Sequence, residues 1–161
     1  MNCDECNQRL RRERKDYKYS ESGLDDVVLV KAPVYVCPRH GVQAVALRNV
    51  AGLHAAIARA LLHRRAPLRG PEIRFLRKHR RWSQEELARQ LRVHPVSVAR
   101  WETGATPVGA GTQQRLRLLF TDPEAFAASA VLPEQKNAPA VPPRLRVPWP
   151  TPSIRRSPRA A

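Results

Sequence analysis

Residues 82–104, with the sequence WSQEELARQLRVHPVSVARWETG, constrain the fold of this chain more than any other stretch. Ser83 and Glu86 have the spacing of a capping box, which predicts a helix that begins directly after Ser83. Pro95 suits the first position of a second helix, and Gly104 suits the end of that helix. Two short helices joined by a turn of three or four residues predict a helix-turn-helix.

The motif SQEELARQL, followed by V, V, RWE and G at fixed spacing, resembles the Cro/cI-type (XRE) helix-turn-helix over residues 71–121. The order, the spacing and the apolar core positions agree with that family. With a preceding helix over 71–80 and a following one in TQQRLRLLF, the unit is predicted to be a bundle of four or five helices. Two residues depart from the family pattern. Arg92 stands where a glycine is usual in the turn, and Pro95 opens the second helix.

The resemblance implies that the second helix, over 95–103, lies in the major groove of DNA. Val98 and Trp101 are three residues apart and should face the core. On the outward side, Arg100 can bond guanine bidentately, whereas Val96 can only pack on a thymine methyl. The family also places a phosphate contact at the residue that corresponds to Gln84. The candidate DNA-binding residues are Gln84, His94, Val96, Ser97 and Arg100.

Charged residues around this unit also have structural interpretations. Glu102 is expected to form a structural ion pair or a cap, not to act as a catalytic acid. The arginines of residues 77–81 are either a solvated face or a set of contacts to the DNA backbone.

Two metal-ligand patterns lie in the first part of the chain. Cys3 and Cys6 form a Cys-x-x-Cys pair, and Cys37 and His40 form a Cys-x-x-His pair. Each pair supplies two corners of a tetrahedral zinc site from one tight turn. The odd count of three cysteines argues against a disulfide framework. We predict a structural Zn²⁺ held by these four residues. The alternative is that His40 is a solvated loop residue and His54 or water completes the site.

The remaining N-terminal sequence predicts a small β domain with one helix. The mixed-charge run RRERKD, residues 11–16, is interpreted as a solvated turn or a hairpin arm. The runs YKYS, DVVLV, VYVC and VQAVALR predict three or four antiparallel strands, with Ala32 and Pro33 separating the second run from the third. Apolar residues of 49–65 recur at helical spacing and predict an amphipathic helix of about three turns, which APLRG then ends.

Residues 1–121 taken together resemble the MqsA-like antitoxins, in which a YgiT-type zinc finger precedes a helix-turn-helix. The resemblance rests on the Cys-x-x-Cys pair and on the segments YSESGLDDVVLV, VYVCPRHG, LHAAIARALL and LRGPEIRFLRK. It implies a structural zinc, with His40 in place of the family's fourth cysteine. It also implies a homodimer on operator DNA and an N-terminal domain that can block an RNase toxin.

The expected fold class is α+β with three segments. A zinc-bound β domain with a helix spans 1–66, a helix-turn-helix bundle spans 67–131, and a Pro/Arg-rich disordered tail spans 132–161. The tail carries either nonspecific charge or extra contacts to phosphate.

The net charge of +15 predicts a polyanionic partner, and double-stranded DNA fits it best. Residues 71–121 contain ten Lys and Arg against four Asp and Glu. The sequence lacks an apolar run of 18 residues and an apolar leader, so we expect a cytoplasmic protein without a membrane partner. The leading hypothesis is a DNA-binding transcriptional regulator that binds its operator as a dimer. The alternative is a type II antitoxin that neutralises a cognate ribonuclease. No enzyme is expected, because four protein ligands leave zinc no open position for water.

Overall fold

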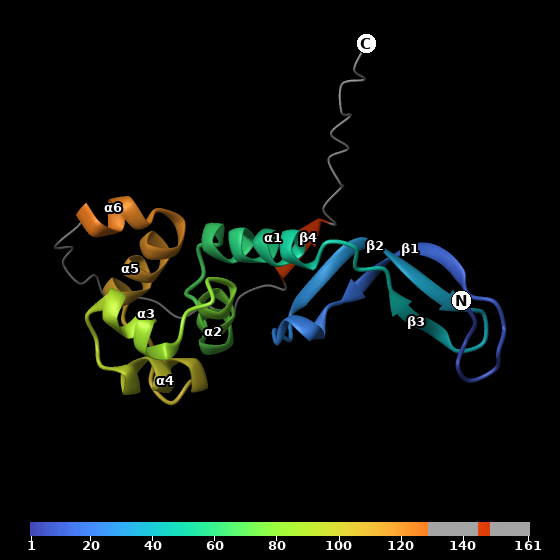
Figure 1. Cartoon of the computed structure of the whole chain (residues 1–161), viewed down its shortest axis with the longest axis horizontal. Coiled ribbons are helices and arrows are strands. Elements are labelled where there is room, and N and C mark those ends of the chain that lie inside the picture. The colour runs from blue at the N-terminus through green and yellow to red at the C-terminus, as the bar shows by residue number, and fades with distance from the viewer. Residues whose placement is uncertain (129–144, 149–161) are drawn as a thin grey trace, which may run out of the picture.

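The structure, a computed structural model, describes residues 1–128 and 145–148. Figure 1 shows a β-sheet at one end of the molecule, a group of short helices at the other end, and a longer helix between them. The sheet carries the cysteine and histidine residues, and the helical group follows it in the chain. The expected α+β fold class is therefore confirmed.

Three antiparallel strands form the body of the sheet, in the order β1 (Arg11–Lys18), β2 (Val27–Cys37) and β3 (Gly41–Val45). The mixed-charge run 11–16 makes most of β1, so the hairpin-arm interpretation is confirmed. Most side chains of β1 are exposed, as suits a charged edge strand.

β2 is one continuous strand, whereas the sequence predicted a break at Ala32 and Pro33. The register shifts between Lys15 and Tyr17 of β1, which marks a β-bulge. At the bulge Lys31 has a positive φ of 53°, and Asp16 Oδ1 accepts its N–H at 3.0 Å. The bulge accommodates the positive φ of Lys31, and Asp16 accepts the Lys31 N–H. The strand therefore continues past Pro33.

One helix, α1 (Val50–His63), packs against the sheet (Figure 1). Asn49 caps it, with the side-chain oxygen accepting the N–H of Gly52 at 2.8 Å. Its predicted apolar face is buried in the same core cluster as Val27 and Leu29 of β2. Its buried residues are Leu53, Ile57, Ala58 and Leu61, whereas Leu62, which the helical spacing also placed on this face, is only partly buried.

Five helices follow α1 in the described part of the chain, which confirms the predicted bundle. They are α2 (Gly70–His79), α3 (Gln84–Leu91), α4 (Pro95–Thr103), α5 (Ala110–Thr121) and α6 (Pro123–Ala128). Their apolar faces meet in a core that contains fully buried Ile73, Leu87, Val98 and Leu116. This core is continuous with that of α1, so the sheet and the bundle share one apolar cluster.

Two side chains of α5 hold the connection between α1 and α2. Arg117 donates hydrogen bonds to the carbonyls of Leu61, Leu62 and Ala66, and thereby satisfies groups that the end of α1 leaves open. The Gln113 amide pairs with both backbone groups of Leu68, accepting at 2.9 Å and donating at 2.8 Å. The connection is therefore fixed to the bundle through its backbone.

Buried Glu72 of α2 forms ion pairs with two arginines of the same connection. Arg64 Nη2 lies 2.7 and 2.8 Å from its two carboxylate oxygens, and Arg69 donates to it as well. Arg69 also reaches Asp26, just before β2, at 2.6 Å. Glu72 is fully buried, and its ion pairs offset the free energy that burial of a carboxylate costs.

The C-terminal segment adds one strand to the sheet. β4 (Leu145–Pro148) pairs in parallel with residues 27–30 of β2. The expected disordered tail over 132–161 is therefore wrong for these four residues, and its other residues lie outside the described part. No helix within residues 1–128 is long and apolar enough to cross a membrane.

Candidate metal centre and nucleic-acid interface

Four side chains converge at the end of the sheet where β2 meets β3. Cys3 Sγ lies 3.3 Å from His40 Nδ1, and Cys6 Sγ lies 3.6 Å from Cys37 Sγ. The four donor atoms are all within 4.8 Å of one another. A tetrahedral zinc ion with Zn–S of about 2.3 Å and Zn–N of about 2.0 Å places such atoms roughly 3.5–3.8 Å apart. The cluster can therefore hold a metal ion of that size.

Backbone turns on both sides orient these donors. On the first side, the N–H of Asn7 donates to Cys3 O at 2.9 Å and Cys3 N–H donates to Gln8 O at 2.8 Å. On the second side, Cys37 ends β2 and Gly41 opens β3 with a positive φ of 76°. The antiparallel pairing of β1 with β2 returns the chain to its start and brings the two turns together.

His54 does not lie in this cluster, so the alternative fourth ligand is wrong. Its Nε2 lies 3.0 Å from the hydroxyl of Tyr19, and its ring meets that of Phe75 edge to face at 5.5 Å. Burial, and then the neighbouring His79, lower the pKa of His54. His54 is a partly buried histidine that links α1 to Tyr19, just after β1, and to α2.

His40 contributes Nδ1 to the cluster and leaves Nε2 on its outer side. Glu5 Oε2 lies 3.7 Å from that Nε2. A carboxylate behind a histidine ligand fixes the ring orientation and raises its basicity. Glu5, from within the first Cys pair, is a residue that the sequence reasoning did not single out.

The turn between α3 and α4 keeps its geometry without the glycine that the family usually has. Arg92 adopts the left-handed conformation, with φ of 55° and ψ of 46°, and its N–H donates to the carbonyls of Ala88 and Arg89. Val93 N–H then donates to Ala88 O at 3.0 Å. Ala88 is buried where the two helices approach each other, as its small size allows.

The outward side of α4 is exposed as predicted. Val96 is 46% exposed, and Arg100 is exposed one turn later. Ser97 is half-buried between them. His94 is exposed, but its Nδ1 accepts the N–H of Val96 at 3.2 Å and so caps the helix. Trp101 is buried in the core, as predicted.

Gln84 and Glu102 belong to a network that sequence reasoning recognised only in part. Arg77 donates to both oxygens of Glu102, at 2.6 and 2.9 Å, and to Trp82 O at 2.9 Å. Gln84 Nε2 donates to the same carboxylate at 2.8 Å. Burial alone would raise the pKa of Glu102, but these hydrogen bonds outweigh it and the pKa is lowered.

Two predictions are decided by this network. The structural role of Glu102 is confirmed. Arg77, which the sequence placed in a run of solvated or DNA-contacting arginines, is buried instead. Nothing in the local sequence distinguishes Arg77 from its neighbours, because its partner lies 25 residues away.

A family model described as a helix-turn-helix domain matches residues 70–124. These residues are a helix-turn-helix domain. The match contains the predicted range and covers α2 to α5 with the start of α6. No curated protein and no solved structure matches the chain. A helix-turn-helix domain indicates DNA binding and a role in transcription regulation.

Proposed function

We propose that this protein is a sequence-specific transcriptional regulator that reads its operator through α4. The observation that carries the proposal is the exposed side of α4, held on buried Val98 and Trp101 within a helix-turn-helix domain. An exposed valine and an exposed arginine one turn apart suit a base-reading surface.

The outward residues have different proposed roles. Arg100 bonds the O6 and N7 of a guanine, and Val96 packs on a thymine methyl. Ser97 and His94 lie toward the start of the helix, where side chains reach base edges and phosphates. Gln84, oriented by Glu102, presents its remaining amide hydrogen to a phosphate. With one strong base contact, sequence discrimination is expected to be modest.

We further propose that Cys3, Cys6, Cys37 and His40 hold a structural Zn²⁺. The proposal is supported by the donor set of three thiols and one imidazole at tetrahedral spacing. Four protein ligands fill the coordination shell of zinc and leave no position for a reacting water. The metal would therefore stabilise the N-terminal sheet and would not catalyse a reaction.

Replacing Arg100 with alanine tests the reading role. Selection of genomic fragments with the purified full-length chain first supplies a specific duplex, and fluorescence anisotropy then measures binding to it and to a scrambled one. Arg100→Ala should weaken binding to the specific duplex by about 1–3 kcal/mol and leave binding to the scrambled duplex nearly unchanged.

The matched control is Arg89→Ala, which removes an exposed arginine from α3. Equal losses on both duplexes for Arg100→Ala would reduce the role of Arg100 to a phosphate contact. Light scattering of the same complexes tests the proposed dimer, since two chains should bind each duplex.

The antitoxin alternative remains a prediction from the resemblance of the N-terminal module. Co-expression with the product of an adjacent gene tests it, because an antitoxin must restore growth that its toxin stops.

A further inference from the structure

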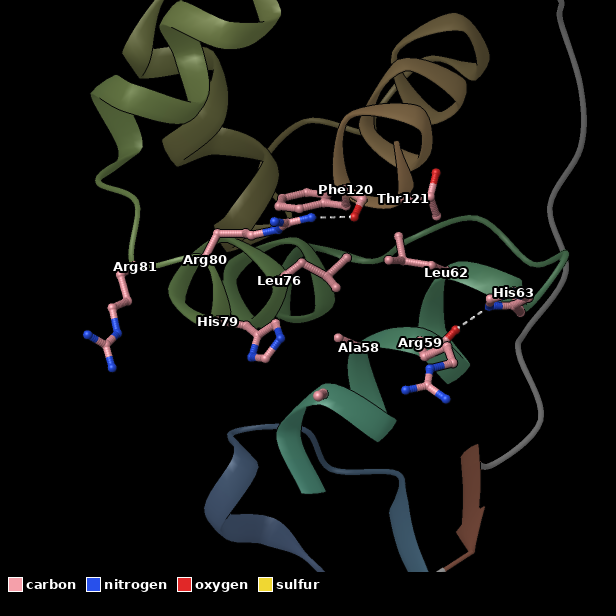
Figure 2. A pocket seen from close by; sticks show the side chains of 11 residues that line it. Ala58, Arg59, Leu62, His63, Leu76, His79, Arg80, Arg81, Phe120 and Thr121 are labelled. Carbon is pink, nitrogen blue, oxygen red and sulfur yellow. Dashed lines mark hydrogen bonds between the residues drawn. The ribbon is translucent and has the colours of Figure 1, made fainter. Parts of the chain in front are cut away.

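A cavity of about 730 Å³ lies where α1, α2 and the end of α5 meet. Figure 2 shows Leu76 and Leu62 in its middle, with Phe120 beside them. Basic side chains of α1, of α2 and of the turn after α2 flank these apolar side chains. The volume lies within the range of about 300–1,000 Å³ that small-molecule sites occupy.

The basic groups of this cavity have no acidic counterpart in its lining. They are Arg59 and His63 from α1, His79 from α2, and Arg80 and Arg81 from the turn after α2. No Asp or Glu lines the cavity. Within the described residues, the guanidinium groups of Arg59 and Arg81 have neither a hydrogen-bond nor an ion-pair partner. The side chains of this lining therefore carry positive charge that no acidic side chain among them offsets.

Helix ends alone do not account for this charge. The last residues of α1, α2 and α5 line the cavity, and basic residues are favoured at such helix ends. However, Arg117 already satisfies the carbonyls at the end of α1, and Arg80 donates to Phe120 O at the end of α5 at 2.8 Å. Arg59 and Arg81 are therefore not needed to satisfy the carbonyl groups at the ends of α1 and α5.

We propose that this cavity binds a small organic anion with an apolar body, such as an aliphatic or aromatic carboxylate. The anionic group pairs with a guanidinium at the rim, and the apolar body covers Leu62, Leu76 and Phe120. An apolar pocket with a few convergent polar groups is the usual form of a small-molecule site. This site is separate from the metal cluster and from α4, and its binding step does not depend on the proposed operator recognition.

Fluorescence titration of the full-length, zinc-loaded chain with 8-anilino-1-naphthalenesulfonate tests the proposal, because this probe combines an anionic group with apolar rings. We expect saturable binding of one probe per chain. Octanoate should displace it, whereas octan-1-ol and inorganic phosphate at equal concentration should not, since the alcohol lacks the charge and phosphate lacks the apolar body.

Three variants locate the site. The double variant Arg59→Gln, Arg81→Gln should weaken probe binding at least tenfold, and Ala55→Phe should reduce it by filling the cavity. The control Arg74→Gln removes one positive charge from α2 outside the cavity lining and should have no effect. Circular dichroism of each variant checks the fold, because partial unfolding would raise the fluorescence of this probe and complete unfolding would abolish it.

Several results would overturn the proposal. They are the absence of saturable binding, equal displacement by octan-1-ol or by phosphate, and unchanged probe binding in the double variant. If the double variant instead lost affinity for DNA with a reduced salt slope and kept the probe, these arginines would be contacts to the DNA backbone.

Discussion

Arg92 occupies a backbone conformation that a residue with a Cβ adopts at a cost. Its φ of 55° places it in the left-handed region, at the end of α3, with its side chain exposed. The turn of the helix-turn-helix needs this conformation, because it lets the backbone satisfy the last carbonyls of α3 before α4 begins. The arginine therefore keeps the geometry of the turn at some expense of stability.

Replacing Arg92 with glycine should stabilise the domain. Relief of the left-handed strain outweighs the greater freedom of glycine in the unfolded chain, and we expect a gain of about 0.5–1 kcal/mol in the free energy of unfolding. Urea unfolding followed by circular dichroism measures it. Arg89→Gly, in the last turn of the same helix, is the control and should lose about 1 kcal/mol. Equal losses at both positions would contradict the strain argument.

His40 should be replaceable by another zinc ligand and by nothing else. His40→Ala removes one corner of the proposed site, so zinc retention should fall more than about 100-fold and the N-terminal sheet should unfold. His40→Cys should retain the metal, because a thiolate can take the same corner. Metal content after dialysis and circular dichroism measure both effects. Normal zinc content in His40→Ala would place the fourth ligand elsewhere.

The two central helices were predictable from sequence because their signals are local. Ser83 and Glu86 form the predicted capping box, and Pro95 and Gly104 bound α4 as expected. The metal cluster was also predictable, since each half of it is a short spacing pattern. These features need only neighbouring residues to specify them.

The contacts between elements were not predictable in the same way. Arg77, Gln113 and Arg117 look like ordinary surface residues in the sequence, yet each is paired with a partner at least 25 residues away. The strand 145–148 was missed for the same reason, because its four residues form a strand only against the distant β2.

The ion pair between α2 and α4 should make stability depend on pH. The folded-state pKa of Glu102 is lowered, so its contribution is present above the unfolded value of about 4.5 and is lost as pH falls through the folded pKa. Glu102→Gln leaves Arg77 buried without its charge partner and should cost about 3 kcal/mol near neutral pH.

The difference between the wild type and Glu102→Gln should therefore shrink as pH drops below about 4.5. Urea unfolding of both zinc-loaded proteins, followed by tryptophan fluorescence, measures this, because the same metal site is present in each and its contribution cancels in the difference. Glu85→Gln, at an exposed position of α3, controls for the general loss of acidic charge. If the difference in the free energy of unfolding stayed constant with pH, the loss of stability in Glu102→Gln would come from packing and not from the lost charge.

The sheet as a whole depends on a segment from the other end of the chain. β4 covers the edge of β2 at residues 27–30. Truncation after residue 128 should leave the β4-facing edge of this part of β2 unpaired, so hydrogen exchange should rise at residues 27–30 and much less at residues 34–37, where β3 pairs. Mass spectrometry of peptides from both segments measures the contrast. Equal protection in the truncated and full-length chains would show that β4 does not hold this edge.

The pairing of β4 with β2 also sets an order of events during synthesis. A ribosome releases residues 27–30 long before it makes residues 145–148, so this part of β2 emerges while its edge is still open. An open edge is a template for pairing with other chains. Crowded polysomes would expose many such edges together, and the charged side chains of β1 on the opposite edge would help to keep neighbouring nascent sheets apart.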